Sequence, residues 1–337
     1  MVRGFPHKLR IVVSRRLPQE VEARLSDLCD TTLNADDRPM TAEQLKAAVR
    51  NSDVFVPTVT DNLNAQIISA AGPDLRLIAN FGAGTDHIDV EAAYAKDIIV
   101  TNTPDVLTED TADLAMVLIL AVPRRLVEGD RLARAGKFTG WAPTGHLGRR
   151  VRGMKLGIIG MGRIGQAVAR RANAFGLSVH YHNRQVLPDP VEVALGATYH
   201  VNLDEMLEHV DIVSVNCPST PHTRHLIDAR RLERIGPDGY IVNTSRGDVI
   251  DEAALARALS EGIIAGAGLD VYEHEPTIHP DLITLTNVVL APHIGSSTSE
   301  SRREMGETVL INIRTWINGR RPPDRVLPPG ALYSRAS

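Results

Sequence analysis

Three side chains of complementary chemistry stand at or just beyond predicted strand ends in the second half of the sequence: Arg246, Glu275 and His293. Arginine presents a planar fork of donors that can hold a carboxylate or polarise a carbonyl oxygen. Histidine can give a proton to an alkoxide near neutral pH, and a neighbouring carboxylate can fix the orientation of its ring. Such a set suits the reduction of a ketone. Taken singly, each residue also has a plainer interpretation, as a surface arginine, a turn glutamate or a helix-capping histidine.

A source of hydride is indicated by the stretch KLGIIGMGRIGQAVARRANAFGLSVHYHNR, residues 155–184. Gly160, Gly162 and Gly165 have G-x-G-x-x-G spacing after a short apolar run, and a helical pattern and a second strand follow. This order predicts a βαβ unit that binds a dinucleotide. The first glycine allows the tight turn, the second lets a pyrophosphate approach the backbone, and the third lets helix and strand pack closely. The phosphates would lie at the helix N-terminus.

The residues after the second strand bear on which dinucleotide is bound. An acid about 20 positions beyond the glycines binds the ribose 2′-hydroxyl of NAD. This sequence instead has His182, Asn183 and Arg184, and the next acid is Asp189. A guanidinium can pair with a 2′-phosphate, so we expect NADP(H) to be preferred and NAD(H) to be the second choice. The alternative is that Arg184 is a solvated loop arginine.

The elements around these motifs predict an α/β fold. Residues 8–101 alternate strands and helices, one helix at 63–71, which favours a parallel sheet covered by helices. Thr108 can cap a buried helix over 111–122. Polar clusters then follow four further strands, at the sheet edge where such folds bind ligands. These strands are predicted at 212–215, 240–242, 264–269 and 288–290.

We therefore expect two Rossmann-like domains. A doubly wound parallel-sheet cofactor domain, residues 105–293, is inserted in a flavodoxin-like substrate domain made of 1–104 and 294–337. Two glycines in FGAGTD, residues 81–86, form either an anion-binding nest or a plain turn. Phe138 and Trp141 lie in a Gly/Pro-rich loop and indicate either a subunit contact or simple core anchoring.

Composition excludes several classes of protein. The 337 residues carry a formal net charge of −4, which gives no sign of a nucleic-acid partner, and no apolar run is long enough to span a membrane. Two cysteines, Cys29 and Cys217, and the absence of a signal region fit a cytoplasmic protein. His274 and His279 do not require a metal, because the chemistry considered above needs none.

The chain resembles the D-isomer-specific 2-hydroxyacid dehydrogenases along nearly its whole length, and within that family it is most similar to the glyoxylate/hydroxypyruvate reductases. The motifs that carry the resemblance are FGAGTDHID, TNTPDVLTEDTAD, GIIGMGRIG, VNTSRGDVID, AGLDVYEHEP and APHIGSST. The resemblance implies that Arg246, Glu275 and His293 are catalytic. It implies substrate binding by Ala83, Gly84, Arg246 and Trp141, the last from the partner in a homodimer. It implies cofactor contacts at Thr108, Gly160, Gly162, Arg163, Ile164, Gly165, Asn183, Arg184, Cys217, Pro218, Thr244, Ser245, Asp270, His293 and Gly295.

The expected activity is reduction of glyoxylate to glycolate and of hydroxypyruvate to D-glycerate. Two alternatives remain. One is a reductase for a bulkier 2-keto acid. The other is a dinucleotide-sensing corepressor, since the family resemblance extends to such proteins; the complete set of Arg246, Glu275 and His293 favours an enzyme.

Overall fold

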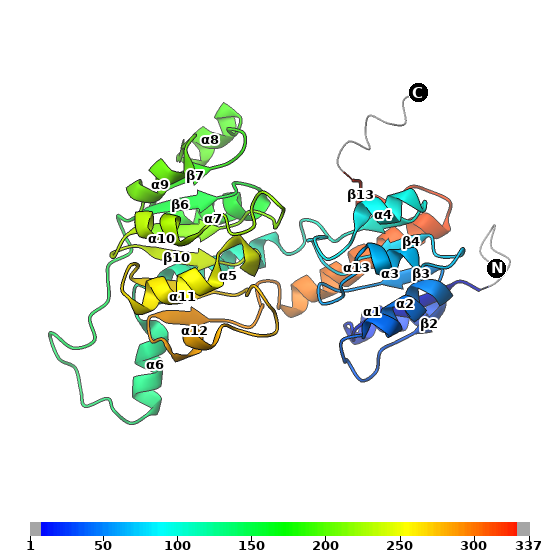
Figure 1. Ribbon diagram of the computed structural model, residues 1–337, viewed down its shortest axis with the longest axis horizontal. Coiled ribbons are helices and arrows are strands. Elements are labelled where there is room, and N and C mark those ends of the chain that lie inside the picture. The colour runs from blue at the N-terminus through cyan, green and yellow to red at the C-terminus, as the bar shows by residue number, and fades with distance from the viewer. Residues whose placement is uncertain (1–7, 329–337) are drawn as a thin grey trace. The chain divides into compact units, whose positions relative to one another are not determined.

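Two β-sheets organise the computed structural model, which describes residues 8–328 (Figure 1). Unit 1 contains the first sheet and consists, within the described residues, of 8–107 and 298–328. Unit 2 contains the second sheet and spans residues 108–297. The chain leaves unit 1, forms the whole of unit 2 and returns, so that one α/β domain is inserted in the other. Among the described helices, none combines the length and the apolar character that a membrane crossing needs.

The sheet of unit 1 has five parallel strands and one antiparallel edge strand, β13. The order β2-β1-β3-β4-β5 is that of flavodoxin-like folds, as the sequence predicted. The inner strands are buried on both faces, which is why they read as short apolar runs. The strands are β1 (Arg10–Val13), β2 (Asp30–Thr32), β3 (Val54–Val56), β4 (Leu77–Ala79), β5 (Ile99–Thr101) and β13 (Arg325–Val326).

Helices cover both faces of this sheet. The first and last helices share one apolar core, and the three others share a second. Asn64 caps α3 by accepting the Ile67 N–H, so the helix begins at Ala65 and is shorter than the predicted 63–71. The helices are α1 (Gln19–Leu28), α2 (Ala42–Asn51), α3 (Ala65–Ser69), α4 (Val90–Ala95) and α13 (Ser299–Ile317).

The sheet of unit 2 has seven parallel strands in the order β12-β11-β10-β9-β6-β7-β8. From β6 the chain adds β7 and β8 on one side, and it then crosses to the other side of β6 to add β9, β10, β11 and β12. This is the doubly wound arrangement that the sequence predicted. The strands are β6 (Lys155–Ile159), β7 (Ser178–His182), β8 (Ala197–Tyr199), β9 (Ile212–Val215), β10 (Tyr240–Asn243), β11 (Gly266–Leu269) and β12 (Val288–Leu290).

The helices of unit 2 form two apolar layers, one containing α5 and α7 and the other containing α9 to α12. Helix α5 begins at Thr108, so this residue is part of the helix rather than a cap before the predicted 111–122. The helices are α5 (Thr108–Ala121), α6 (Leu126–Arg134), α7 (Arg163–Ala174), α8 (Asp189–Leu195), α9 (Leu203–His209), α10 (Ala229–Ile235), α11 (Glu252–Ser260) and α12 (Pro280–Thr284), with a 3₁₀ turn η1 (Gly247–Val249).

Three histidines pack together: His180 on β7, the strand that leads to Asn183 and Arg184, His200 after β8 and His209 at the end of α9. His180 Nδ1 lies 3.0 Å from His200 Nε2, and the ring centroids of His180 and His209 are 5.0 Å apart. Burial, with smaller contributions from the charges of His200, His209 and Lys155, lowers the pKa of His180 to about 4. In an unfolded chain an imidazole titrates near pH 6.5, so between these two values the unfolded protein binds more protons than the folded one.

The cluster makes stability depend on pH. As pH falls from 6.5 toward 5, the free energy of unfolding should decrease by about 1–2 kcal/mol on account of His180, and above pH 6.5 this contribution should be constant. Urea unfolding curves of the parent protein and of His180→Gln measure the effect, which the variant should lose. Exposed His222 serves as the control: if His222→Gln flattens the pH dependence as much, burial of His180 is not its cause.

Candidate active site

The glycine loop between β6 and α7 has the geometry that a dinucleotide requires. Gly160 has φ +92, and a Cβ there would lie 2.7 Å from the Cys217 backbone nitrogen. A Cβ on Gly165 would lie 2.3 Å from the Gly160 carbonyl oxygen. Gly162 is the N-cap of α7, and no other part of the described chain lies within 4 Å of where its Cβ would be. The loop is therefore packed tightly at two glycines and open at the third, which fits an approaching pyrophosphate.

Arg184 stands just beyond the end of β7. The turn before it is held by Tyr199, whose hydroxyl donates to the Asn183 carbonyl at 3.1 Å. Arg184 is exposed, and within residues 8–328 it forms no hydrogen bond or ion pair. Asp189, the next acid, is the first residue of α8. The position after β7 thus carries an exposed basic side chain, and the first acid that follows it in the sequence belongs to α8.

His293 and Glu275 form a hydrogen-bonded pair. His293 Nδ1 lies 2.7 Å from Glu275 Oε2, and the Tyr272 backbone N–H donates to Glu275 Oε1 at 3.1 Å. Partial burial by itself would raise the pKa of Glu275, but the hydrogen bond and charge of His293, the Tyr272 N–H and the charge of Arg246 together lower it. Glu275 is therefore an ionised partner that orients the imidazole and leaves Nε2 facing away from it.

The turn that carries His293 is anchored by Asp270. Oδ1 of this carboxylate accepts the Ile294 N–H at 2.7 Å and Oδ2 accepts the Gly295 N–H at 2.8 Å. The His293 N–H donates to the Asp270 carbonyl, and His293 itself has φ +55. Burial raises the pKa of Asp270 despite these two bonds. The sequence predicts Asp270 as a cofactor contact; in the structure its side chain fixes the backbone that follows His293.

Arg246 follows β10 in a turn organised by Asn243. The Asn243 amide donates to the Arg246 carbonyl at 2.9 Å and its oxygen accepts the Ser245 N–H at 3.0 Å. Arg246 donates from its guanidinium to the Ser245 carbonyl at 2.8 Å. Because its charge acts on Glu275, the three residues Arg246, Glu275 and His293 belong to one electrostatic environment at the carboxyl edge of the unit 2 sheet.

Three other predicted residues, Cys217, Ala83 and Gly84, are placed in the two units. Cys217 follows β9 and is buried, which raises the pKa of its thiol to about 11 and removes it as a nucleophile at neutral pH. Ala83 and Gly84 lie in unit 1, where their carbonyls accept hydrogen bonds from Asn102 and Asn80, respectively. In the described part of the chain, no three His, Cys, Asp or Glu side chains are placed to hold a metal ion.

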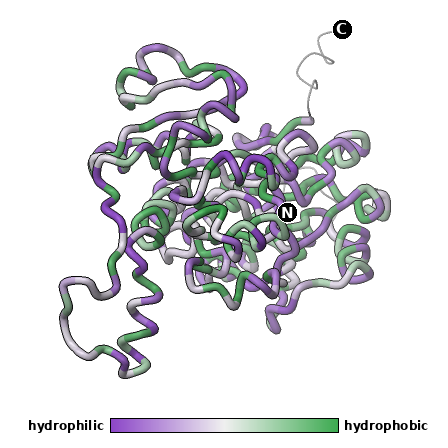
Figure 2. Tube along the Cα trace, turned by 60° about the vertical axis from the view of Figure 1, so that its left-hand side comes forward, coloured by the Kyte–Doolittle hydropathy of each residue, from purple (hydrophilic) through white to green (hydrophobic). Residues whose placement is uncertain are grey.

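Trp141 lies in the loop after α6, which extends away from the sheet of unit 2 (Figures 1 and 2). Trp141 is 86% exposed, and Phe138 and Leu147 in the same loop are 68% and 64% exposed. The expectation that this loop packs into the core of its own chain is therefore not met. The exposed apolar side chains leave the expectation of a subunit contact open.

A Rossmann sheet with an open glycine loop, and a histidine–carboxylate pair with an arginine at its carboxyl edge, define a dinucleotide-dependent dehydrogenase. A family model described as the D-isomer specific 2-hydroxyacid dehydrogenase NAD binding domain matches residues 116–295. The chain belongs to this family, and its resemblance to the glyoxylate reductases is confirmed.

Similar proteins cover almost the whole chain. A glyoxylate reductase of Thermococcus onnurineus is 42% identical over 323 residues, 95% of this chain and 96% of its own length. One of Korarchaeum cryptofilum is 43% identical over 96% of this chain and 99% of its own. The crystal structure of an NADPH-dependent glyoxylate/hydroxypyruvate reductase from Sinorhizobium meliloti, with NADP and malonate, has 37% identity and a TM-score of 0.85, covering 95% of this chain and 97% of that one.

Proposed function

We propose that this protein reduces small 2-keto acids, with glyoxylate and hydroxypyruvate converted to glycolate and D-glycerate. The observation that carries the proposal is the 2.7 Å pair of His293 and Glu275 beside Arg246, at the edge of the sheet where Rossmann folds bind ligands. Relatives named glyoxylate reductase, similar over nearly the whole chain, support the choice of small substrates.

Each residue has a distinct role in the proposed reaction. A bound nicotinamide dinucleotide supplies the hydride that reaches the keto carbon. His293 donates a proton from Nε2 to the keto oxygen, and Glu275 holds the ring while it does so. Arg246 binds the substrate carboxylate and polarises the keto oxygen. Backbone N–H groups of Ala83 and Gly84 also bind the carboxylate, and Trp141 closes the substrate site from a partner subunit.

The proposed cofactor contacts are those of the glycine loop and of the residues that follow the strands of unit 2. Gly160, Gly162 and Gly165, with the start of α7, hold the pyrophosphate. Residues after neighbouring strands hold the riboses and the nicotinamide. The further contacts are Thr108, Arg163, Ile164, Asn183, Arg184, Cys217, Pro218, Thr244, Ser245, Asp270, His293 and Gly295.

Initial rates of cofactor oxidation with glyoxylate and with hydroxypyruvate, each with NADPH and NADH, test the proposal. We expect turnover of both substrates. Larger 2-keto acids, with branched or aromatic side chains, should be poorer substrates. A higher kcat/KM for one of these would make the protein a reductase of bulkier keto acids, and no turnover across a wide panel would contradict an enzymatic function.

We also propose that NADPH is preferred, through a pair between Arg184 and the 2′-phosphate. Replacing this arginine by glutamine should lower kcat/KM for NADPH by about 10- to 100-fold, since a hydrogen bond to a charged group is worth about 1.5–3 kcal/mol. The value for NADH should stay the same and is the internal control. An equal loss with both cofactors would show that Arg184 does not distinguish them.

A homodimer in the reducing cytoplasm is the proposed form of the protein. The support for the dimer is the extended loop after α6, whose Phe138, Trp141 and Leu147 side chains expose apolar surface to solvent. Large apolar side chains gathered on one exposed segment are typical of contact surfaces. The support for the compartment is that Cys29 and Cys217 are both free thiols.

A further inference from the structure

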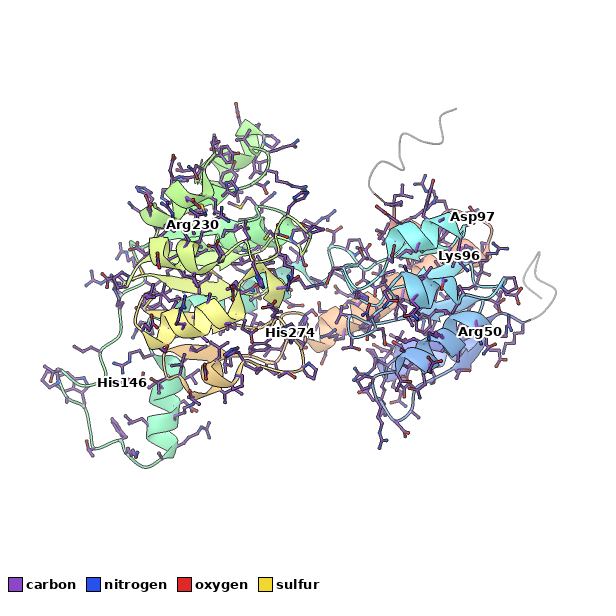
Figure 3. All side chains as sticks on the ribbon, in the orientation of Figure 1. Arg50, Lys96, Asp97, His146, Arg230 and His274 are labelled. Atoms are coloured by element: carbon purple, nitrogen blue, oxygen red, sulfur yellow. The ribbon has the colours of Figure 1, made fainter. Side chains whose placement is uncertain are left out.

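The loop between β11 and α12 carries Glu275, and one side chain holds it at two places. Glu252 Oε2 accepts a hydrogen bond from the Glu273 backbone N–H at 2.8 Å. Glu252 Oε1 accepts another from the His279 backbone N–H, also at 2.8 Å. These two bonds lie on either side of Glu275 along the chain, so a single carboxylate closes residues 273–279 into a loop. His274, labelled in Figure 3, belongs to the same segment.

Glu252 is buried, with 8% of its surface exposed. Burying a carboxylate is costly unless its oxygens are hydrogen-bonded. Here each oxygen has a loop N–H as its partner, and bonds to a charged acceptor are about twice as strong as neutral ones. Binding both N–H groups requires two acceptor oxygens at the end of a side chain of this length. An amide has one acceptor oxygen and a shorter acid has less reach, so neither would reproduce the two bonds.

Capping of α11 does not explain this carboxylate. The cap is Asp251, whose side chain accepts the Ala254 N–H at 2.9 Å. Glu252 is the next residue and lies in the first turn, where the helix dipole favours negative charge. Since Asp251 already caps α11, the two oxygens of Glu252 bind the loop rather than the N-terminus of their own helix.

The same loop packs against the segments that carry the other two site residues. A Cβ on Gly247, next to Arg246, would lie 1.9 Å from the Tyr272 carbonyl carbon, so the two backbones are in direct contact. The Tyr272 hydroxyl donates to the Ala291 carbonyl at 2.8 Å, two residues before His293. The start of the loop is therefore coupled to both neighbouring segments, and Glu252 joins this start, at Glu273, to the far end of the loop at His279.

We propose that Glu252 is a positioning residue of the active site, which sets the Glu275 carboxylate against the His293 ring. This inference deepens the function proposed above and rests on it. Glu252 acts only through the loop: it holds the Glu273 and His279 amides, and the segment between them presents Glu275. Misplacing a catalytic group by about 1 Å can cost about 100-fold in rate, so an effect on turnover is expected.

Kinetics of the Glu252→Gln variant test the proposal. An amide oxygen can accept one loop N–H, but its NH₂ group faces the other N–H with a second donor, so one end of the loop is released. We expect kcat to fall about 10- to 100-fold, with little change in KM for the keto acid or in NADPH binding. The alkaline limb of the kcat–pH profile should move to lower pH, because a displaced carboxylate stabilises protonated histidine less.

Two further variants separate this effect from a general loss of stability. Glu261→Gln changes an exposed acid at the other end of α11 and should match the parent protein. Glu252→Asp keeps the charge with a shorter reach, and serves if the glutamine variant does not fold. Parent values of kcat and an unchanged pH profile in a folded Glu252 variant would overturn the proposal.

A double-mutant cycle decides whether Glu252 acts through Glu275. In a Glu275→Gln background, adding Glu252→Gln should reduce kcat little further, because the group being positioned has already been changed. The same fold-loss in both backgrounds would show a role independent of Glu275 and would contradict the inference.

A readout without substrate keeps the inference separate from the proposed function. A proton shared between His293 and Glu275 should give a low-field ¹H NMR signal, assigned by its loss in His293→Gln. The signal should weaken or shift in Glu252→Gln and stay unchanged in Glu261→Gln. If the parent protein turned over no keto acid but the signal still depended on Glu252, the function would fail and the positioning role would hold. An unaltered signal in Glu252→Gln would overturn that role.

Discussion

The His293→Ala variant is expected to reduce glyoxylate at least about 100-fold more slowly than the parent protein, because general acid catalysis typically contributes about 10²- to 10⁴-fold. Hydride transfer to a keto carbon leaves negative charge on the oxygen, and this charge must be neutralised as it forms. Nδ1 of His293 faces Glu275 at 2.7 Å, so Nε2 is the ring nitrogen left to donate a proton in the proposed reaction. Alanine removes the proton donor and leaves Glu275 without its partner.

A matched control is available on the Glu275 loop. His274 is exposed (Figure 3), and His274→Ala should retain turnover close to that of the parent. The far-UV circular dichroism spectrum and melting temperature of His293→Ala should match those of the parent protein, which shows that the fold is intact. If turnover of the His293 variant stayed within about 10-fold of the parent, another group would have to donate the proton.

The glycine motif was predictable from sequence because each of its residues has a backbone role that other residues cannot fill. Gly160 has a positive φ and no room for a Cβ, and Gly165 has no room either. The glycine spacing, with the apolar run before it and the helical and strand patterns after it, therefore predicted β6, α7 and β7. In contrast, β2 and β8 have three residues each, of sequences DTT and ATY, and lack the apolar run that marks a buried strand.

The side-chain geometry of the candidate site was only partly predictable. Sequence placed Glu275 and His293 near strand ends, but the 2.7 Å contact between them depends on two loops whose shapes are set by hydrogen bonds from distant residues. Asp270 holds the His293 turn and Glu252 holds the Glu275 loop. The sequence did not indicate that Glu252 holds this loop, since an acid that follows a capping aspartate is usually an exposed residue in the first turn of a helix.

Arg246→Ala is expected to lower kcat/KM for the keto acid by about 10²- to 10⁴-fold. A guanidinium can bind a carboxylate through two parallel charge-assisted hydrogen bonds, each worth about 1.5–3 kcal/mol. The Arg246→Lys variant keeps the charge and loses the fork, so it should recover only part of this loss. Equal activity of Arg246→Lys and the parent protein would mean that charge alone is needed and that no bidentate contact is made.

The division of this loss between KM and kcat tells the two proposed roles of Arg246 apart. An interaction with the substrate carboxylate is the same in the ground state and the transition state, so losing it raises KM and leaves kcat unchanged. An interaction with the keto oxygen strengthens as negative charge develops there, so losing it lowers kcat. Because the charge of Arg246 reaches Glu275 and Glu275 holds the proton donor, we expect both constants to change. A pure KM effect would leave polarisation of the keto oxygen to His293 alone.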